Sequence, residues 1–536
     1  MTSAHTAPIS ARWIVGLLTA AFIATGFAFA AVTPLFQNPD EPTHLDMARH
    51  YASHPTEFAG PSLRQTQGLR GAIISTGLKD EALPPNFSRI PENRPDYLDF
   101  DGYGGDAPAT TGCPVSCQNY QYIHPPGWYL LVSPVAAALG NAPFPELVLM
   151  LRLIDVLLAS VAVWSTWYIA RHVWPECPRR ALFAAALTAC FGPFIATAAA
   201  VNNDALMLGL MAVSLAVIAR ILRRGSEPRP VLLLGVLVGA GLLTKGEFLV
   251  IAGVAVVALL VAPKREALWR TALRFGIPAA MGALWWARVI VDTHSLTPAG
   301  SEIVSAPHDG PFRSVGLFTY LGDHLSDFTN RFPGVYGWLS VKLPDWARTV
   351  FQVGAITSVI AWLGLRRWQR PRYAEARFAV LALAPALLFA SMMWSSFSTF
   401  HSNGEVRGMA PRYVYGSVPV LAVGVVAALA AVATRIKPLR SGPALAVSLV
   451  VVASAGAAFS FAIAMRGLYA TTSIDEMIHR ASVVSPVSRP SLFTFVAAVT
   501  WATTVLATAW LLWSGRVRTE PESVLDDVRT EALASG

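Results

Sequence analysis

Residues 13–34 read WIVGLLTAAFIATGFAFAAVTP, a run of about 22 residues without a charged side chain. A helix of this length is long enough to cross the hydrocarbon core of a bilayer, which is about 30 Å thick. The segment 28–30 (AFA) resembles a signal-peptide cleavage site, but the run exceeds the roughly 7–15 apolar residues of a signal-peptide core. Because Arg12 precedes it, we predict a retained first transmembrane helix with a cytoplasmic N-terminus.

The composition of the whole chain follows the same pattern. Of 536 residues, 54% are hydrophobic and 14% are charged, and the mean hydropathy is +0.47. Soluble domains carry about 25% charged residues, and a single soluble core does not grow to this size, whereas a helix bundle in lipid does. The composition therefore predicts an all-α polytopic membrane protein.

Further apolar runs follow the first at regular intervals. They lie at 148–171, 181–200, 204–222, 231–244, 247–262, 271–291, 347–365, 378–397, 413–434, 443–465 and 491–514. Together with the first run they predict a bundle of about twelve transmembrane helices. A shorter run at 127–140 suits an interfacial or re-entrant helix better than a span.

The net charge of +8 is distributed in short basic clusters between the apolar runs. If 127–140 does not cross, six alternate connections fall on one side, and each is basic: 172–180, 223–230, 263–270, 366–376, 435–440 and the tail. Cytoplasmic loops carry such an excess of Lys and Arg. The clusters therefore indicate membrane topology, and we expect no nucleic-acid partner.

This topology divides the chain into four parts. Residues 1–34 form the cytoplasmic N-terminus and first helix, and 35–147 an extracytoplasmic loop with interfacial helices. Residues 148–514 form the transmembrane bundle, with an outer loop at 292–345, and 515–536 a polar cytoplasmic tail that we predict to be disordered. A polar loop of roughly 90 residues is usually functional, so we place any active site on the extracytoplasmic face.

The acidic segment 38–44 (NPDEPTH) follows the first helix directly. Its prolines prevent the helix from continuing. Adjacent carboxylates repel unless a cation or a hydrogen-bonding partner offsets them, so Asp40 and Glu41 are candidates for a general base and for ligands of a divalent cation. A plainer interpretation is a solvated turn in which the acidic pair caps the next helix. Spacing alone does not decide between the two.

Other polar residues on the predicted outer face are candidate binding groups. His44 and His124 are single histidines, and most such residues bind nothing. Asn202, Asn203 and Asp204 begin a helix, so capping by an Asn or Asp is the simplest explanation for them. The cations among these candidates are Lys245, Arg407 and Arg412. A cation at the outer end of a helix opposes the usual charge bias, and two of them, Lys245 and Arg412, suit a phosphate that enters from the bilayer.

Two further features of the sequence are a pair of cysteines in the long loop and a charged interruption in an apolar run. Cys113 and Cys117 lie in the long polar loop, where a disulfide is expected in an oxidising compartment; a zinc site is less favoured, because no third cysteine is near. Residues 244–247 (TKGE) interrupt an apolar stretch. A lysine and a glutamate at membrane depth are costly and usually functional, so a break is favoured over one kinked helix.

Five stretches, in order, carry a family resemblance. They are 38–44 (NPDEPTH), 122–129 (YIHPPGWY), 202–206 (NNDAL), 243–246 (LTKG) and 411–413 (PRY). With them the chain resembles the GT-C superfamily of membrane glycosyltransferases, and within it the bacterial membrane protein family of domain of unknown function 2142. The likeness extends from the first helix to the tenth and implies a GT-C-like fold in the bacterial cytoplasmic membrane.

The resemblance also implies a reaction. Such enzymes transfer a sugar from a polyprenyl-phosphate donor to an envelope glycan or glycolipid acceptor, with inversion. By resemblance Asp40 is the general base, Glu41 orients the acceptor or shares a cation, and Lys245 and Arg412 hold the donor phosphate. No cofactor is certain, and metal use varies in the superfamily. His124 departs from the pattern, since relatives often have lysine there, and acceptor binding is expected from loops 35–126 and 292–345.

Two other function classes stay open. A transporter or flippase for lipid-linked saccharides would share the bundle and the phosphate contacts, but it would place polar residues midway along several helices. The predicted helix centres are instead mostly Ala, Leu and Val. A non-catalytic assembly protein would keep the fold, and the intact acidic pair at 40–41 weighs against it.

Overall fold

The computed structural model describes residues 9–60, 62–75, 105–111, 117–293, 314–366, 377–404, 406, 409–433, 443–514 and 517–518. The longer helices are α1 (Ala11–Val32), α2 (Glu41–Ser53), α3 (Gln67–Ser75), α4 (Gly127–Ala138), α5 (Phe144–Val173), α6 (Pro178–Ala189), α7 (Gly192–Ala198), α8 (Asp204–Arg224), α9 (Pro228–Leu242), α10 (Phe248–Val261), α11 (Leu268–Thr293), α12 (Leu317–Arg331), α13 (Asp345–Arg366), α15 (Leu383–Asn403), α16 (Val418–Ala433), α17 (Pro443–Leu468), α18 (Ile474–Val484) and α19 (Pro490–Trp513). The 3₁₀ helices are η2 (Tyr120–Ile123), η5 (Arg377–Ala382), η6 (Pro411–Tyr413) and η7 (Tyr415–Ser417), and the strands are β1 (Ile9–Ser10), β2 (Val335–Tyr336), β3 (Val341–Lys342) and β4 (Val517–Arg518).

The prediction of a helical membrane protein is confirmed. Each of the twelve predicted runs coincides with a described helix or helix pair. Among the described residues, six helices are long and apolar enough to cross a membrane, or seven if the bent pair α6–α7 is one span. Helices α4, α9 and α10 are apolar but shorter. The predicted dozen helices are therefore present, and about half of them meet both the length and the apolarity of a span.

Two predicted boundaries can be compared directly with the structure. The single run 181–200 is wrong as one straight helix, because α6 and α7 meet at an angle of 57°. Pro193 lies in the first turn of α7, where a proline is tolerated but prevents α6 from continuing. The predicted break at 244–247 is confirmed, since α9 ends at Leu242 and α10 begins at Phe248.

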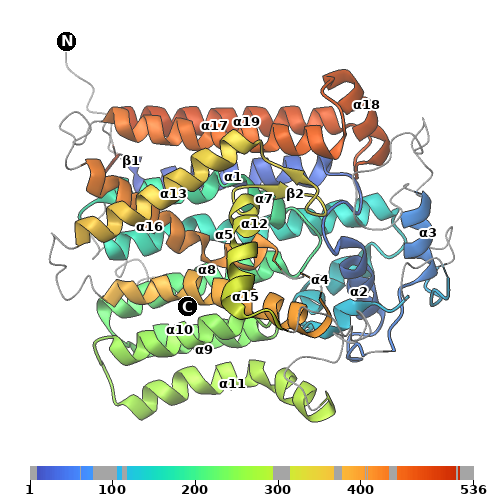
Figure 1. Cartoon of the computed structure of the whole chain (residues 1–536), viewed down its shortest axis with the longest axis horizontal. Coiled ribbons are helices and arrows are strands. Elements are labelled where there is room, and N and C mark those ends of the chain that lie inside the picture. The colour runs from blue at the N-terminus through green and yellow to red at the C-terminus, as the bar shows by residue number, and fades with distance from the viewer. Residues whose placement is uncertain are drawn as a thin grey trace, which may run out of the picture.

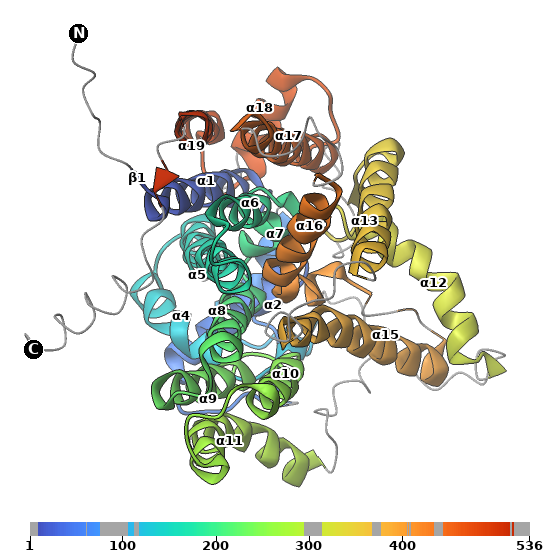
Figure 2. The same ribbon diagram turned by 90° about the vertical axis from the view of Figure 1, so that its left-hand side faces the viewer.

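The helices lie in layers around a central core. Viewed end-on, α5, α6 and α8 occupy the middle, α1, α17 and α19 lie on one side, and α9, α10 and α11 on the other (Figure 2). Helix α1 packs against α19, α5 against α8, and α9 against α11. Buried alanines, leucines and phenylalanines of α1, α5, α6 and α8 form the main hydrophobic cluster.

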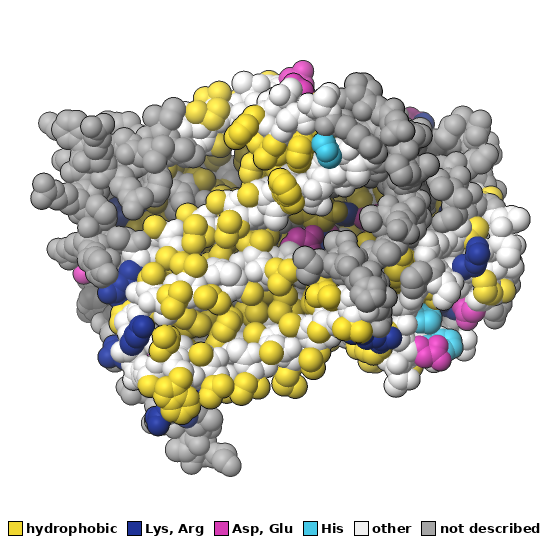
Figure 3. Space-filling view, turned by 60° about the horizontal axis from the view of Figure 1, so that its bottom comes forward, with side chains coloured by type: hydrophobic (Ala, Val, Ile, Leu, Met, Phe, Trp, Pro, Cys, Tyr) yellow, Lys and Arg dark blue, Asp and Glu magenta, His cyan; other side chains and the backbone are white. Residues whose placement is uncertain are grey.

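The surface over α9 and α11 is apolar. Side chains such as Leu233, Ile277 and Leu284 are exposed there, and hydrophobic side chains cover this face while Lys and Arg gather toward one edge (Figure 3). A water-soluble protein rarely exposes an apolar area of this kind. In a multi-pass membrane protein the same area faces lipid.

The two ends of the bundle differ. At one end, β1 pairs in parallel with β4, so that Ile9 lies beside Val517 (Figure 1). The opposite end, the site end, carries α2, α3, α4 and the β2–β3 hairpin. The first and last described segments of the chain therefore meet at one end of the bundle.

Candidate functional site

Four motifs that are far apart in the sequence meet at the site end. They are the acidic segment after α1, the first residue of α8, the break between α9 and α10, and η6. Ion pairs join one residue from each: Asp40 with Arg412, Asp204 with Lys245, and Arg412 with Asp204, whose Nε and Oδ2 atoms are 3.5 Å apart. We call these four residues the charged cluster.

Asp40 holds an unusual backbone conformation. It occupies the N-cap position of α2 with φ 63° and ψ 0°, in the left-handed region, and its side chain caps nothing. A left-handed residue other than glycine costs about 1–2 kcal/mol, although aspartate tolerates it better than most. The carboxylate instead accepts a hydrogen bond of 2.8 Å from the Tyr120 hydroxyl and pairs with Arg412. The capping interpretation of this aspartate is therefore wrong.

The surroundings of Asp40 keep it ionised. Burial alone would raise the pKa of the Asp40 carboxyl, but the positive charge and hydrogen bond of Arg412 outweigh it, and the pKa falls well below its usual range. The side chain is 22% exposed. In this state Asp40 is a charged partner of Arg412 and a poor acceptor of protons.

Glu41 takes a different position from its neighbour. It is fully buried and forms a two-pronged ion pair with Arg152 of α5, with distances of 2.7 Å to Nε and 2.6 Å to Nη2. Arg152 also donates to the carbonyls of Ala30, Thr33 and Pro34 at the end of α1. The pair thus ties the acidic segment to α1 and α5.

Asp204 and Lys245 form the inner part of the cluster. Asn202, not Asp204, caps α8, because its Oδ1 atom accepts hydrogen bonds from the backbone N–H groups of residues 204 and 205. The Asp204 carboxylate is left to pair with Lys245, which lies 3.8 Å from Glu247. The ring of Tyr413 lies 4.9 Å from Lys245 Nζ and 5.4 Å from the Arg412 guanidinium, a cation–π arrangement that favours both cations.

The two predicted histidines lie beside the cluster. The rings of His44 and His124 stack at 6.0 Å, and His44 Nδ1 is 2.8 Å from the Tyr129 hydroxyl. Asn203 is buried as well and donates to the carbonyl of Thr244 at 3.3 Å, which joins α8 to the helix break. Burial lowers the pKa of both histidines, that of His44 to about 3, so both are neutral at pH 7.

The neutral state of His44 predicts an acid-sensitive fold. An unfolded histidine has a pKa near 6.5, so below that pH the unfolded chain binds a proton that the folded chain does not, and stability falls as the pH drops toward 3. The loss is at most about 1.4 kcal/mol per pH unit. His44→Asn, which keeps the polar contact to Tyr129, should lose less thermal stability in detergent between pH 7 and pH 5 than wild type. Equal losses would contradict the assignment.

Some predicted residues remain outside this comparison. Arg407 and Cys113 lie outside the described residues. Cys117 is disulfide-bonded, and Cys177 and Cys190 are free thiols. No group of three His, Cys, Asp or Glu residues in the described part of the chain could hold a divalent cation. The Asp40 and Glu41 carboxylates pair with two different arginines, so we assign no metal to them.

Several residues of the site were not among the residues predicted from the sequence. Arg152 and Asp155 lie within the apolar run 148–171, and charges at such a depth are a recognised sign of function. Asp155 accepts a 2.7 Å hydrogen bond from Trp128 Nε1 and a 3.3 Å one from the backbone N–H of Asn202. It therefore joins the segment 122–129 to the start of α8. Tyr120 had no signal of its own, because its contact with Asp40 depends on the fold.

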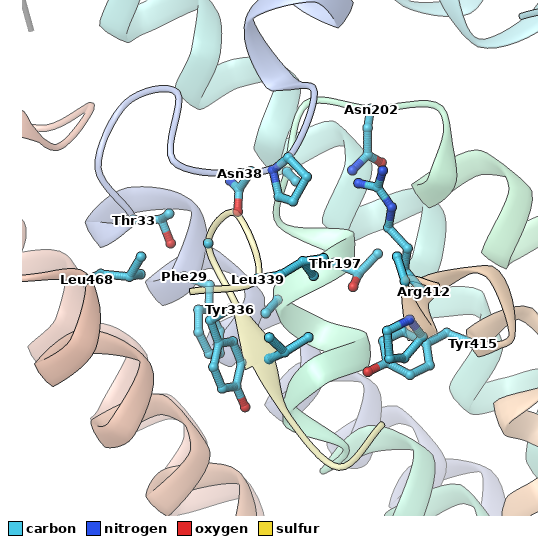
Figure 4. Close-up of a pocket in the computed structure, with 17 residues that line it drawn as sticks. Phe29, Thr33, Asn38, Thr197, Asn202, Tyr336, Leu339, Arg412, Tyr415 and Leu468 are labelled. Carbon is cyan, nitrogen blue, oxygen red and sulfur yellow. The ribbon is translucent and has the colours of Figure 1, made fainter. Parts of the chain in front are cut away.

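A pocket opens beside the cluster. It contains about 570 Å³ of empty space, part of it open solvent, and Arg412 and Tyr415 lie on one side with Phe29 and Tyr336 on the other (Figure 4). Asn38 and Pro39, next to Asp40, also line it. The β2–β3 hairpin is fastened over the acidic segment by a 3.0 Å hydrogen bond from Trp338 Nε1 to the carbonyl of Phe36. The pocket thus receives residues from both outer loops.

Comparison with solved structures finds broad likenesses. ArnT from Cupriavidus metallidurans, in a crystal structure bound to undecaprenyl phosphate, is 16% identical with a TM-score of 0.47, over 95% of this chain and 76% of ArnT. The oligosaccharyltransferase of Archaeoglobus fulgidus in the apo form is 13% identical with a TM-score of 0.44, over 88% of this chain and 56% of that protein. Because these scores are low, the function is argued below from the chain's own residues.

The sequence itself gives the family. No curated protein matches it. Residues 23–422 match the family model described as "Predicted membrane protein (DUF2142)". This segment runs from within α1 into α16 and contains all four residues of the charged cluster. The chain therefore belongs to the DUF2142 membrane protein family.

Proposed function

We propose that this protein is a membrane glycosyltransferase that moves a sugar from a polyprenyl-phosphate donor to an envelope glycan or glycolipid. The observation that carries the proposal is the charged cluster beside a pocket at one end of the bundle. It unites a candidate base, Asp40, with two cations, Lys245 and Arg412, that suit a phosphate. Structural ion pairs of a helix bundle would not require a carboxylate held in a left-handed conformation.

The chemistry assigns a role to each group. The acceptor hydroxyl gives its proton to the Asp40 carboxylate while its oxygen attacks the anomeric carbon of the donor sugar. The bond from that carbon to the phosphate oxygen breaks on the opposite side, which inverts the configuration. Arg412 and Lys245 stabilise the negative charge that develops on the departing phosphate. The pocket between Arg412 and Tyr336 provides room for the reacting sugar.

The supporting residues have positioning roles in this proposal. Glu41 and Arg152 hold the acidic segment in place, and Asn203 joins α8 to the break that carries Lys245. His44 and His124 are neutral polar groups beside the cluster and are candidates for contacts with sugar hydroxyls. We place this site on the extracytoplasmic side of a bacterial inner membrane, because the described basic residues at the start of α6, at the end of α8 and between α10 and α11 belong to the opposite end of the bundle.

Complementation tests the proposal. Wild type and Asp40→Asn are expressed in a strain lacking the gene, and envelope sugars and polyprenyl-phosphate sugars are analysed together. We expect one envelope sugar to return with wild type only, while the matching lipid-linked donor accumulates with the variant. If both versions restore the envelope equally, Asp40 is not the base, and a transporter or an assembly protein becomes the better explanation.

Loss of a cation should weaken donor binding. A charge-assisted hydrogen bond contributes about 1.5–3 kcal/mol, so Arg412→Gln should raise the KM for the lipid-linked donor by roughly 10- to 100-fold. Arg331→Gln is the matched control, because it removes an arginine from an ion pair within α12. An equal effect of the two substitutions on KM would exclude Arg412 as a phosphate contact.

A further inference from the structure

The cations of the charged cluster are already matched by carboxylates. Arg412 pairs with Asp40 and approaches Asp204, and Lys245 pairs with Asp204 and approaches Glu247. Two positive charges thus face three negative ones. An incoming phosphate adds a further negative charge to a site of this kind, which like-charge repulsion opposes. The phosphate can form an ion pair with Arg412 or Lys245 only if it displaces a carboxylate from that cation.

Asp40 is the carboxylate that a phosphate can displace. Asp204 is 2% exposed, begins α8 and contacts both cations, so its displacement would leave the buried Lys245 with only the more distant Glu247, at 3.8 Å, among its described ion-pair partners. Asp40 is 22% exposed, lies at the N-cap position just before α2, and holds a left-handed conformation. A strained residue at the edge of a site, held by a single ion pair and one hydrogen bond, is the one most easily displaced.

Arg412 also has a donor to spare. Within the described part of the chain its Nε atom is buried and makes no hydrogen bond, although it lies 3.5 Å from Asp204 Oδ2. Arg412 is one of the residues that line the pocket, and its side chain extends toward Asn202 (Figure 4). A planar guanidinium binds phosphate through two parallel hydrogen bonds, and Nη2, now bonded to Asp40, together with Nε could supply them.

We propose that the Asp40–Arg412 ion pair is a latch that a lipid-linked phosphate opens. The phosphate replaces the Asp40 carboxylate on Arg412, and Asp40 is released toward the pocket with a free acid oxygen. This rests on the proposed function, because it assigns the latch to the same base and the same donor class. Its consequence is ordered binding: the donor comes first, and the base becomes available to an acceptor hydroxyl only afterwards.

Loss of the Arg412 contact and arrival of an anion each raise the affinity of the Asp40 carboxylate for protons. The resting protein therefore keeps a poor base, and the donor-bound protein gains a better one. An acceptor hydroxyl, or water, would meet no active base before the donor is present.

A binding measurement without catalysis tests the latch. The full-length protein is purified in detergent, and farnesyl phosphate is titrated while native mass spectrometry reports occupancy. Asp40→Asn should bind about tenfold more tightly than wild type, because the competing charge is gone. Glu247→Gln removes a carboxylate near Lys245 but not one on Arg412, and should change affinity by less than about threefold.

A double variant separates competition from general charge removal. Arg412→Gln should bind weakly, and Asp40→Asn combined with Arg412→Gln should bind no better, because the gain requires the arginine. If the double variant keeps the tenfold gain, or if Asp40→Asn matches wild type or Glu247→Gln, the latch is refuted. Failure of both wild type and Asp40→Asn to bind farnesyl phosphate refutes it as well.

A measurement on the wild type avoids any effect of substitution on folding. Carbodiimide modifies accessible, protonatable carboxyls, and peptide mass spectrometry locates them. Modification of Asp40 should increase several-fold when farnesyl phosphate is bound and stay constant at Asp106, an exposed carboxylate outside the site. Unchanged modification of Asp40 would overturn the latch while leaving the transferase assignment to the complementation result.

Discussion

Asp40→Asn should lower the rate of sugar transfer by about 10²- to 10⁴-fold, which is the usual contribution of a general base. Asparagine matches aspartate in shape but accepts no proton from an acceptor hydroxyl. The side chain is partly exposed at the site end, so the variant should fold and insert normally. The measurement is transfer by purified protein from a polyprenyl-phosphate sugar to an envelope extract, with donor binding determined in parallel.

The donor-binding measurement distinguishes loss of the base from loss of donor binding. A variant with lost transfer and retained or tighter donor binding identifies Asp40 as the base. Asp106→Asn is the matched control, since it also removes a carboxylate from the same loop region, far more exposed and paired with Arg49. Transfer by Asp40→Asn at more than a tenth of the wild-type rate would contradict the assignment.

Arg152→Ala should destabilise the protein by about 3–5 kcal/mol, the cost of breaking a buried ion pair and leaving one charge without a partner. Both side chains of the pair are 0% exposed. Arg152 additionally holds three backbone carbonyls at the end of α1, which would be left unsatisfied. The expected result is a large drop in the melting temperature in detergent, together with loss of transfer.

Arg49→Ala is the control for this prediction. Arg49 is 13% exposed and pairs at 3.0 Å with Asp106, which is 71% exposed; an ion pair with one partner in solvent contributes about 0–1 kcal/mol. If Arg152→Ala and Arg49→Ala have melting temperatures within about a degree of each other, the Glu41–Arg152 ion pair does not hold the acidic segment in place. Glu41→Gln, with normal folding and unchanged transfer, would equally remove Glu41 from the proposal.

Much of the fold could be predicted from the sequence, because lipid imposes a strong rule on it. Every backbone group in the hydrocarbon core must be bonded internally, so each apolar run becomes a helix. The break at Lys245 could also be predicted, because a charge at that depth is costly. The bend between α6 and α7 was missed, although Gly192 and Pro193 stand where α7 begins.

The site was harder to predict, because its partners are distant in sequence. The family resemblance singled out Asp40, Lys245 and Arg412, and the structure brings them together with Asp204, for which capping had been the simplest explanation. No local pattern predicts that Asp40 pairs with Arg412 across 372 positions. Nor does a local pattern predict that Glu41 is bonded to Arg152. Two adjacent carboxylates cannot be told apart from the sequence, because the backbone conformation decides which partner each one reaches.

The packing of α1 against α19 has a consequence for how the protein is made. Helix α1 ends at Val32 and α19 begins at Pro490, so 458 positions separate them. At the usual 5–20 residues per second, the ribosome needs roughly 20 to 90 seconds between the two. During that interval the face of α1 that α19 will cover stays open to lipid or to an insertion chaperone. Assembly around the first helix is therefore completed only when the last one arrives.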